Sequence, residues 1–286
     1  MRKFVRYAAW TLGGLAALVL VALGAVYLLS GRAIGRTYDV PLATVALPAD
    51  SAALAEGERL ARVRGCLGCH GDRLQGTVFF DEPGVAKLTA GNLTRAARRY
   101  SDAELARIIR HGVRPDGSSV FGMPSQTYFH LTDADLGKIL AFVRSVPETD
   151  GPDSELEARL LGRVGILVKQ YHPSAVLADS AARLAAADPD TGLGHYLAKS
   201  VCTECHGLDL GGEGGMQTPA LSIASAYSPE AFTRLMREGI ALDGTEKGLM
   251  TAVAKGRFSW MTDAEIMALW EYLSGRSASP PSSTSR

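Results

Sequence analysis

The chain has 286 residues, of which 47% are hydrophobic, and its 30 basic and 30 acidic side chains give a formal net charge of zero. That balance excludes the strongly basic surface that nucleic-acid binding requires. The length allows two small domains beside a membrane segment.

The first predicted element is a membrane-spanning helix. Residues Ala8 to Ser30 form an apolar run without a charged side chain, which is long enough to cross a bilayer. Three basic residues precede the run and two follow it, so charge alone gives little information on orientation. A cleaved signal peptide is the alternative, but it would have a shorter apolar core and a small-residue cleavage site. We therefore predict an uncleaved anchor over residues 1–36.

Two five-residue motifs contain every cysteine of the chain and place a histidine directly after each pair. They are Cys66-Leu67-Gly68-Cys69-His70 and Cys202-Thr203-Glu204-Cys205-His206. Thiols two residues apart on one helical turn can each add to a vinyl group of one porphyrin, and the next histidine then lies under the iron. A zinc site would want a second Cys or His pair, and a thioredoxin-like pair would want a βαβ context. The sequence shows neither, so we predict two covalent haems c with His70 and His206 as iron ligands.

The two motifs belong to two copies of one module. The copies align without gaps over two stretches, residues 100–113 with 227–240 and residues 131–135 with 261–265. We predict domains over residues 50–146 and 190–275. Between them, residues 147–189 begin with Pro, Gly and acidic residues and are read as a linker, and residues 276–286 as a disordered tail.

The repeated segments carry helix-start signals. These are capping boxes at Ser101 with Glu104 and at Thr262 with Glu265, and an N-cap at Ser228 followed by Pro229. Apolar residues then recur at helical spacing, and nothing alternates with period two for long enough to require a sheet. We therefore expect an all-α soluble part with long loops.

Each half resembles a class I cytochrome c domain in its order of segments. An opening helix (57–64; 194–200) leads to C-x-x-C-H-G, a loop with Asn-Leu-Thr or Pro-Ala-Leu-Ser, a middle helix, a methionine loop and a closing helix. The resemblance implies a methionine as the sixth iron ligand, which is Met123 in the first half and Met250 in the second. Met261 aligns with Leu131 and Met236 lies on an apolar stripe, so both are read as packing residues.

The resemblance also implies contacts around the haem. The carbonyl of Pro219 is expected to accept the Nδ1 proton of His206, which would orient that ligand, and Gly91 stands at the same place in the first half. Asn92 is a candidate for a hydrogen bond to a haem propionate, with a loop turn as the alternative. The other four histidines are not expected to bind iron.

Opposite charges distinguish the two halves. Residues 51–147 hold 13 basic and 10 acidic side chains, a balance of plus three, whereas residues 192–275 hold 6 and 10, or minus four. Such domains could dock on one another or steer redox partners, and ordinary surface variation is the alternative.

The expected function is electron transfer rather than catalysis. A methionine ligand favours ferrous iron, and a six-coordinate iron has no open position for substrate. The resemblance to bacterial c-type cytochromes places haem attachment in the periplasm, so we expect a single-pass inner-membrane protein with a cytoplasmic amino terminus.

The expected partners are redox proteins, among them a membrane dehydrogenase or a terminal oxidase. Residues 36–41 and the methionine loops resemble cytochrome subunits of sugar and alcohol dehydrogenases, which generally carry three haems. A dihaem subunit of a cbb-type oxidase is one alternative, and a dihaem peroxidase, which opens one iron, is another.

Overall fold

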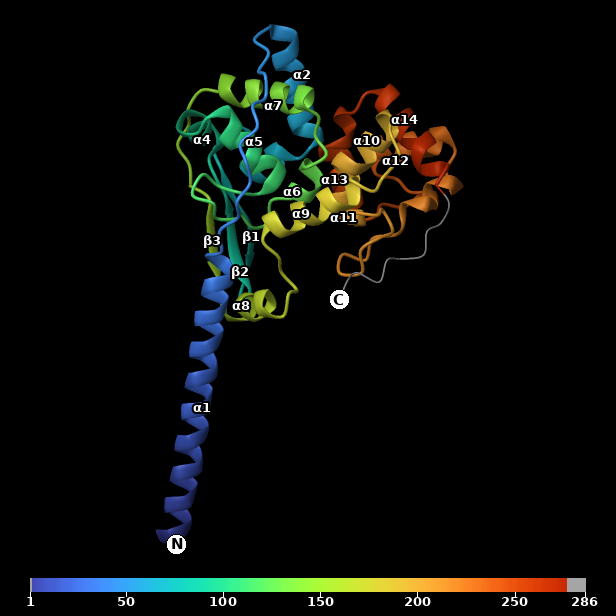
Figure 1. The fold of residues 1–286 in the computed structure, drawn as a ribbon. Coiled ribbons are helices and arrows are strands. Elements are labelled where there is room, and N and C mark those ends of the chain that lie inside the picture. The colour runs from blue at the N-terminus through green and yellow to red at the C-terminus, as the bar shows by residue number, and fades with distance from the viewer. Residues whose placement is uncertain (1, 277–286) are drawn as a thin grey trace.

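The computed structural model describes residues 2–276 and is mostly helical (Figure 1). The helices are α1 (Arg2–Ile34), α2 (Ser51–Val63), α3 (Cys66–His70), α4 (Leu93–Arg99), α5 (Asp102–His111), α6 (Ser125–Tyr128), α7 (Asp133–Ser145), α8 (Leu160–Leu167), α9 (Ser174–Ala185), α10 (Leu193–Leu197), α11 (Thr203–His206), α12 (Pro229–Glu238), α13 (Leu249–Gly256) and α14 (Asp263–Ser274). A π-helical turn covers Ala198–Cys202, and 3-10 turns cover Leu221–Ala226 and Phe258–Trp260. Of the predicted tail 276–286, all but Arg276 lies outside the described residues.

Helix α1 projects from the rest of the molecule as one continuous helix of 33 residues (Figure 1). It is long and apolar enough to cross a membrane by length and composition. Its leucines, such as Leu12 and Leu20, are mostly exposed. The connecting residues 35–49 run along the first domain, where Tyr38 N donates to Gly117 O at 2.9 Å and Val45 is buried. Helix α1 is therefore tied to that domain.

The expectation that the soluble part has no sheet is wrong. Three strands, β1 (Thr77–Glu82), β2 (Ala86–Ala90) and β3 (Glu155–Ala158), form an antiparallel sheet in the order β1-β2-β3. Five of the six β1 residues are exposed. The residues of the central strand β2 are buried or half-buried, and none of them alternates with an exposed residue. Neither strand therefore shows the period-two pattern on which a sequence-based prediction depends.

Residues 147–189 form ordered elements that pack on the first domain. Strand β3 pairs with β2, and helix α9 lies against α5 and α6. Short helix α8 lies beside α1. The segment read as a linker thus supplies three elements to the surroundings of the first domain.

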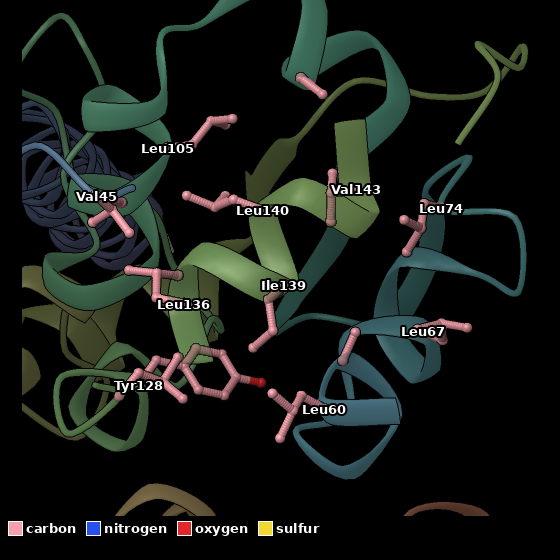
Figure 2. Close-up of a cluster of buried hydrophobic side chains, with 14 residues drawn as sticks. Val45, Leu60, Leu67, Leu74, Leu105, Tyr128, Leu136, Ile139, Leu140 and Val143 are labelled. Carbon is pink, nitrogen blue, oxygen red and sulfur yellow. The ribbon is translucent and has the colours of Figure 1, made fainter. Parts of the chain in front are cut away.

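Each domain has its own apolar core, and the opening and closing helices cross in the same way in both. Figure 2 shows the first core, where Leu60 of α2 and Leu136, Ile139 and Leu140 of α7 are almost fully buried.

A glycine stands at each helix crossing. A Cβ added to Gly57 would lie 2.1 Å from Lys138 O, and one added to Gly194 would lie 2.1 Å from Ala268 O. The two backbones are therefore in direct contact, and only glycine fits there.

The predicted helix starts are confirmed. Ser101 and Glu104 form a capping box at the start of α5, and Thr262 and Glu265 form another at the start of α14. Ser228 caps α12, with proline in its first turn. These caps satisfy amide groups of the first turn and fix where the middle and closing helices begin.

Candidate functional site

The Cys66–His70 motif forms the single turn of α3. Gly65 before it and Gly71 after it have φ angles of 76° and 81°, a region that glycine adopts without strain. Because the spacings are three and four residues, both thiols and the imidazole of His70 emerge from one turn. In the second domain Gly207 ends the motif with φ 79°, but a π-helical turn leads into it.

Both motif histidines are held by a backbone carbonyl. His70 Nδ1 lies 2.7 Å from Gly91 O, and His206 Nδ1 lies 2.8 Å from Pro219 O, the acceptor expected from the sequence. A carbonyl only accepts, so Nδ1 carries the proton and Nε2 keeps its lone pair. Burial lowers the pKa of both imidazoles. Each side chain is therefore a neutral imidazole of fixed orientation, which is the form that binds iron.

A threonine ties each motif to the loop that follows it. Thr77 Oγ1 donates to Cys69 O at 2.7 Å, and Thr218 Oγ1 donates to Cys205 O at 2.6 Å. Sequence reasoning missed this pair because the threonines stand at different distances from their motifs. The hydrogen bonds fix the carbonyl end of each short helix.

The two candidate methionines pack against the cores of their own domains. Met123 follows Gly122, and its carbonyl accepts from Ser174 Oγ at 2.7 Å. Met250 is the second residue of α13. Each shares its core with the first cysteine of the motif, Cys66 or Cys202.

The other second-domain methionines are core residues. Met236 and Met261 are each 2% exposed and belong to the second apolar core. That placement agrees with their reading as packing residues.

Asn92 lies at the N-terminus of α4 and is 3% exposed. Its Oδ1 accepts from Arg95 N and from Thr94 Oγ1, and its Nδ2 donates to Thr149 O at 2.6 Å. The side chain thus caps a helix and joins it to residue 149. The propionate contact stays a prediction.

The surroundings of the thiols do not suit a reactive thiol pair. Burial raises the pKa of Cys66 to about 11 and that of Cys202 to about 12, whereas reactive cysteines have lowered pKa values. Within residues 2–276, no three His, Cys, Asp or Glu side chains gather as a metal-ligand group. Two thiols and one oriented imidazole in each motif instead match the attachment site of a covalent haem c.

Arg257 lies at the interface between the domains and joins the second motif to the residues just before the first. Its Nη1 is 2.9 Å from Glu204 Oε2 inside the second motif, and its Nε donates to Val63 O at 3.3 Å. The guanidinium also lies over Gly65, where an added Cβ would be 2.7 Å from Cζ. Val63 itself belongs to the core of the second domain. The second motif is therefore tied to the residues that lead into the first.

Further contacts close this interface. Arg59 makes a two-pronged ion pair with Glu265 at 2.7 and 2.9 Å, and Thr203 Oγ1 donates to Thr127 Oγ1 at 3.0 Å. The Arg59–Glu265 pair joins a cation of the first domain to an anion of the second, in keeping with the docking alternative from the sequence.

A second arginine, Arg64, is 1% exposed two residues before Cys66. Its Nη2 lies 3.2 Å from Tyr196 Oη, which donates to Asp135 Oδ2 at 2.5 Å. Nε and Nη1 of Arg64 have no hydrogen-bond partner. The buried Arg64 and the partly buried Arg257 therefore place positive charge near the motifs, a feature that no local sequence pattern indicates.

Comparison with known proteins places the chain among cytochromes. The family described as cytochrome c oxidase, cbb3-type, subunit III matches residues 52–143 and 187–273. The cytochrome c subunit of a quinone alcohol dehydrogenase from Gluconacetobacter polyoxogenes is 28% identical over 195 residues, 63% of this chain and 39% of that protein. The corresponding subunit from Gluconobacter oxydans (strain 621H) is 26% identical over 174 residues, 55% of this chain and 36% of that protein.

A further relative is the fructose dehydrogenase cytochrome subunit of Gluconobacter japonicus, which is 22% identical over 260 residues. That match covers 77% of this chain and 52% of the relative. The chain thus spans about two fifths to one half of the length of these curated relatives.

Proposed function

Because the chain belongs to the cytochrome c family described as cytochrome c oxidase, cbb3-type, subunit III, we propose that it is a membrane-anchored dihaem cytochrome that relays single electrons. Cys66 and Cys69 would bind one haem c, with His70 and Met123 on its iron. Cys202 and Cys205 would bind the other, with His206 and Met250 on its iron. Bound haem supplies one-electron chemistry at iron.

The observation that carries the proposal is the joining of two oriented C-x-x-C-H motifs at one interface. Arg257 contacts the residues around both motifs, so the two haems would be held at a fixed separation. Gly91 and Pro219 hold the imidazoles through Nδ1, which limits reorganisation when the iron changes its charge. Both are properties of an electron relay.

A redox titration of the detergent-solubilised full chain tests this function. We expect two haems per chain, two reversible one-electron steps, and low-spin ferric spectra with a methionine-to-iron band from both haems. A high-spin ferric haem that consumes peroxide would contradict the relay and favour a peroxidase.

The proposed electron donor is a membrane dehydrogenase. The named relatives are cytochrome subunits of alcohol and fructose dehydrogenases, and α1 would hold the chain beside such a complex. Co-purification from solubilised membranes tests the partner. Recovery with a terminal oxidase instead would support the second candidate, to which the family's description points.

The proposed topology has the amino terminus in the cytoplasm and both haem domains in the periplasm of a bacterial inner membrane. Covalent attachment of haem c on the periplasmic side supports it, and the length of α1 allows it. Protease added to spheroplasts should digest the haem domains. Full protection of the haem domains would indicate the opposite orientation.

A further inference from the structure

Helix α8 presents an apolar side to solvent. Leu161 and Val168 are 60% and 66% exposed, and Val164 lies between them on the same stripe. The glycines Gly162 and Gly165 face the protein instead, and both are buried. A surface helix normally has the opposite arrangement. A continuous exposed apolar stripe marks an interaction surface.

The helix lies at the end of α1 that adjoins the domains (Figure 1). Arg163 Nη1 donates to Ser30 Oγ at 3.0 Å, and its guanidinium lies 4.5 Å from the centre of the Tyr27 ring. Ser30 is fully buried by this contact region. The two helices are therefore joined by specific contacts of their side chains.

The position of these contacts along α1 determines how deep α8 would lie in a membrane. Tyr27 and Ser30 lie in the last turn of the apolar run, and the charged Arg32 follows. On the same face, Val26 and Leu23 are partly covered. Leu23 is seven residues from Ser30, which corresponds to roughly 10 Å along a helix. In a membrane that α1 spans, α8 would lie where the acyl chains meet the head groups.

We infer that α8 is a second membrane contact, with Leu161, Val164 and Val168 inserted into the outer interface of the bilayer that α1 crosses. The inference rests on the anchoring in the proposed function. A lipid surface is the occupant because the stripe continues the exposed apolar surface of α1. The Arg163 guanidinium lies over the Tyr27 ring and donates to the polar Ser30, which is a position that cationic side chains adopt at membrane interfaces.

The consequence is an orientation of the haem domains that one helix could not fix. A single span leaves a domain free to rotate about the helix axis. A second contact beside α1, together with residues 35–49 bound along the first domain, fixes which face of the domains lies toward the membrane. Partners in the same membrane would then meet one defined surface.

Spin-label accessibility in the haem-loaded full chain tests this inference. Single variants Leu161→Cys and Val168→Cys would carry nitroxide labels in phosphatidylcholine nanodiscs, with both irons reduced to limit magnetic broadening. Leu15→Cys on α1 is the lipid reference, and Leu184→Cys on α9 is the aqueous reference. Leu15 and Leu184 are 58% and 50% exposed. Unchanged haem spectra would show that each variant has folded.

We expect the labels at 161 and 168 to be accessible to oxygen and shielded from a water-soluble nickel reagent, as at 15. If the label at 15 is shielded from the nickel reagent while the labels at 161 and 168 are as accessible as the label at 184, the second membrane contact is wrong. The proposed membrane anchor would still hold. If position 15 also matches 184, the proposed anchor itself fails. Low access to both reagents at 161 would mean a protein partner or a second copy, which also overturns the inference.

Discussion

The two domains fill the same position beside the middle helix in different ways. In the second, Thr251 of the methionine-bearing helix packs on Gly239 and donates to its carbonyl at 2.6 Å. In the first, Ser174 of the intervening helix α9 packs on Gly112 and donates to Met123 O at 2.7 Å. The second methionine is thus positioned by its own helix and the first by a segment outside the repeat. Both domains have a methionine loop, but the segments that support the two loops differ.

The largest expected effect comes from breaking the helix crossing of one domain. Gly194→Val would push α10 from α14, because the new side chain meets Ala268 O and Tyr272 Cβ, at a cost of about 3 kcal/mol. Gly57→Val should cost less, because the sheet and α9 also brace the first domain. Denaturant melts followed at each haem's methionine band measure both. Gly256→Val, where no atom lies within 4 Å of an added Cβ, is the control. An equal loss of stability in this variant would contradict the role of the helix crossing.

Removing one candidate sixth ligand at a time should change the spectrum and potential of one haem without the other. Met250→Ala should remove one methionine-to-iron band and lower one reduction potential by on the order of 0.1 V, because the axial ligand sets the potential. Met123→Ala should act on the other haem. Met261→Ala, which changes the apolar core of the second domain, should leave both bands in place. An unchanged spectrum in Met250→Ala would show that the assigned ligand is wrong.

Charge at the interface should act on both haems together. Arg257→Gln is expected to lower both potentials by tens of millivolts, because a nearby, partly buried positive charge favours ferrous iron. Glu204→Gln removes its partner and should shift both potentials in the opposite direction. A titration of each variant measures this, and a shift confined to one haem would contradict a shared charge.

Ser174→Ala should affect the first haem alone and by less than Met123→Ala. It removes the donor to Met123 O but leaves the thioether, so the methionine band should shift or weaken. Ser180→Ala, further along α9, is the control. The matched change Thr251→Val should disturb only the second haem. An equal effect of Ser174→Ala on both haems would mean that α9 does not specifically support the Met123 loop.

A pH-dependent loss of stability is expected from His130, which lies near Lys199 and His195 of the second domain. Burial, with Lys199 and His195 nearby, lowers the pKa of His130 to about 4, against about 6.5 in an unfolded chain. The folded state binds this proton less readily, so its stability is complete above about pH 6.5 and falls toward pH 4. Thermal melts across that range measure the loss. His130→Gln should remove this residue's contribution to the pH dependence of the stability. An identical pH profile in the variant would contradict the prediction.

Much of the fold follows from local patterns. The cysteine motifs, the capping boxes and the methionine loops each occupy a few neighbouring residues, so their roles could be predicted without a structure. The sheet could not, since β1 is exposed and β3 comes from a segment about 70 residues later. The interface could not either, because Arg257 and Val63 are 194 residues apart in the chain. Their contact depends on how the domains dock.

The position of the motifs inside the domain interface has a consequence for biogenesis. Arg257 covers Gly65 directly before Cys66, and Thr203 directly after Cys202 bonds across to the first domain. An attachment enzyme needs both cysteines and the porphyrin edge in reach. The four cysteines are only partly exposed once the domains are docked. Haem attachment before docking would leave both motifs clear of these contacts, so the contacts that join the two domains also bear on the order in which the protein is assembled.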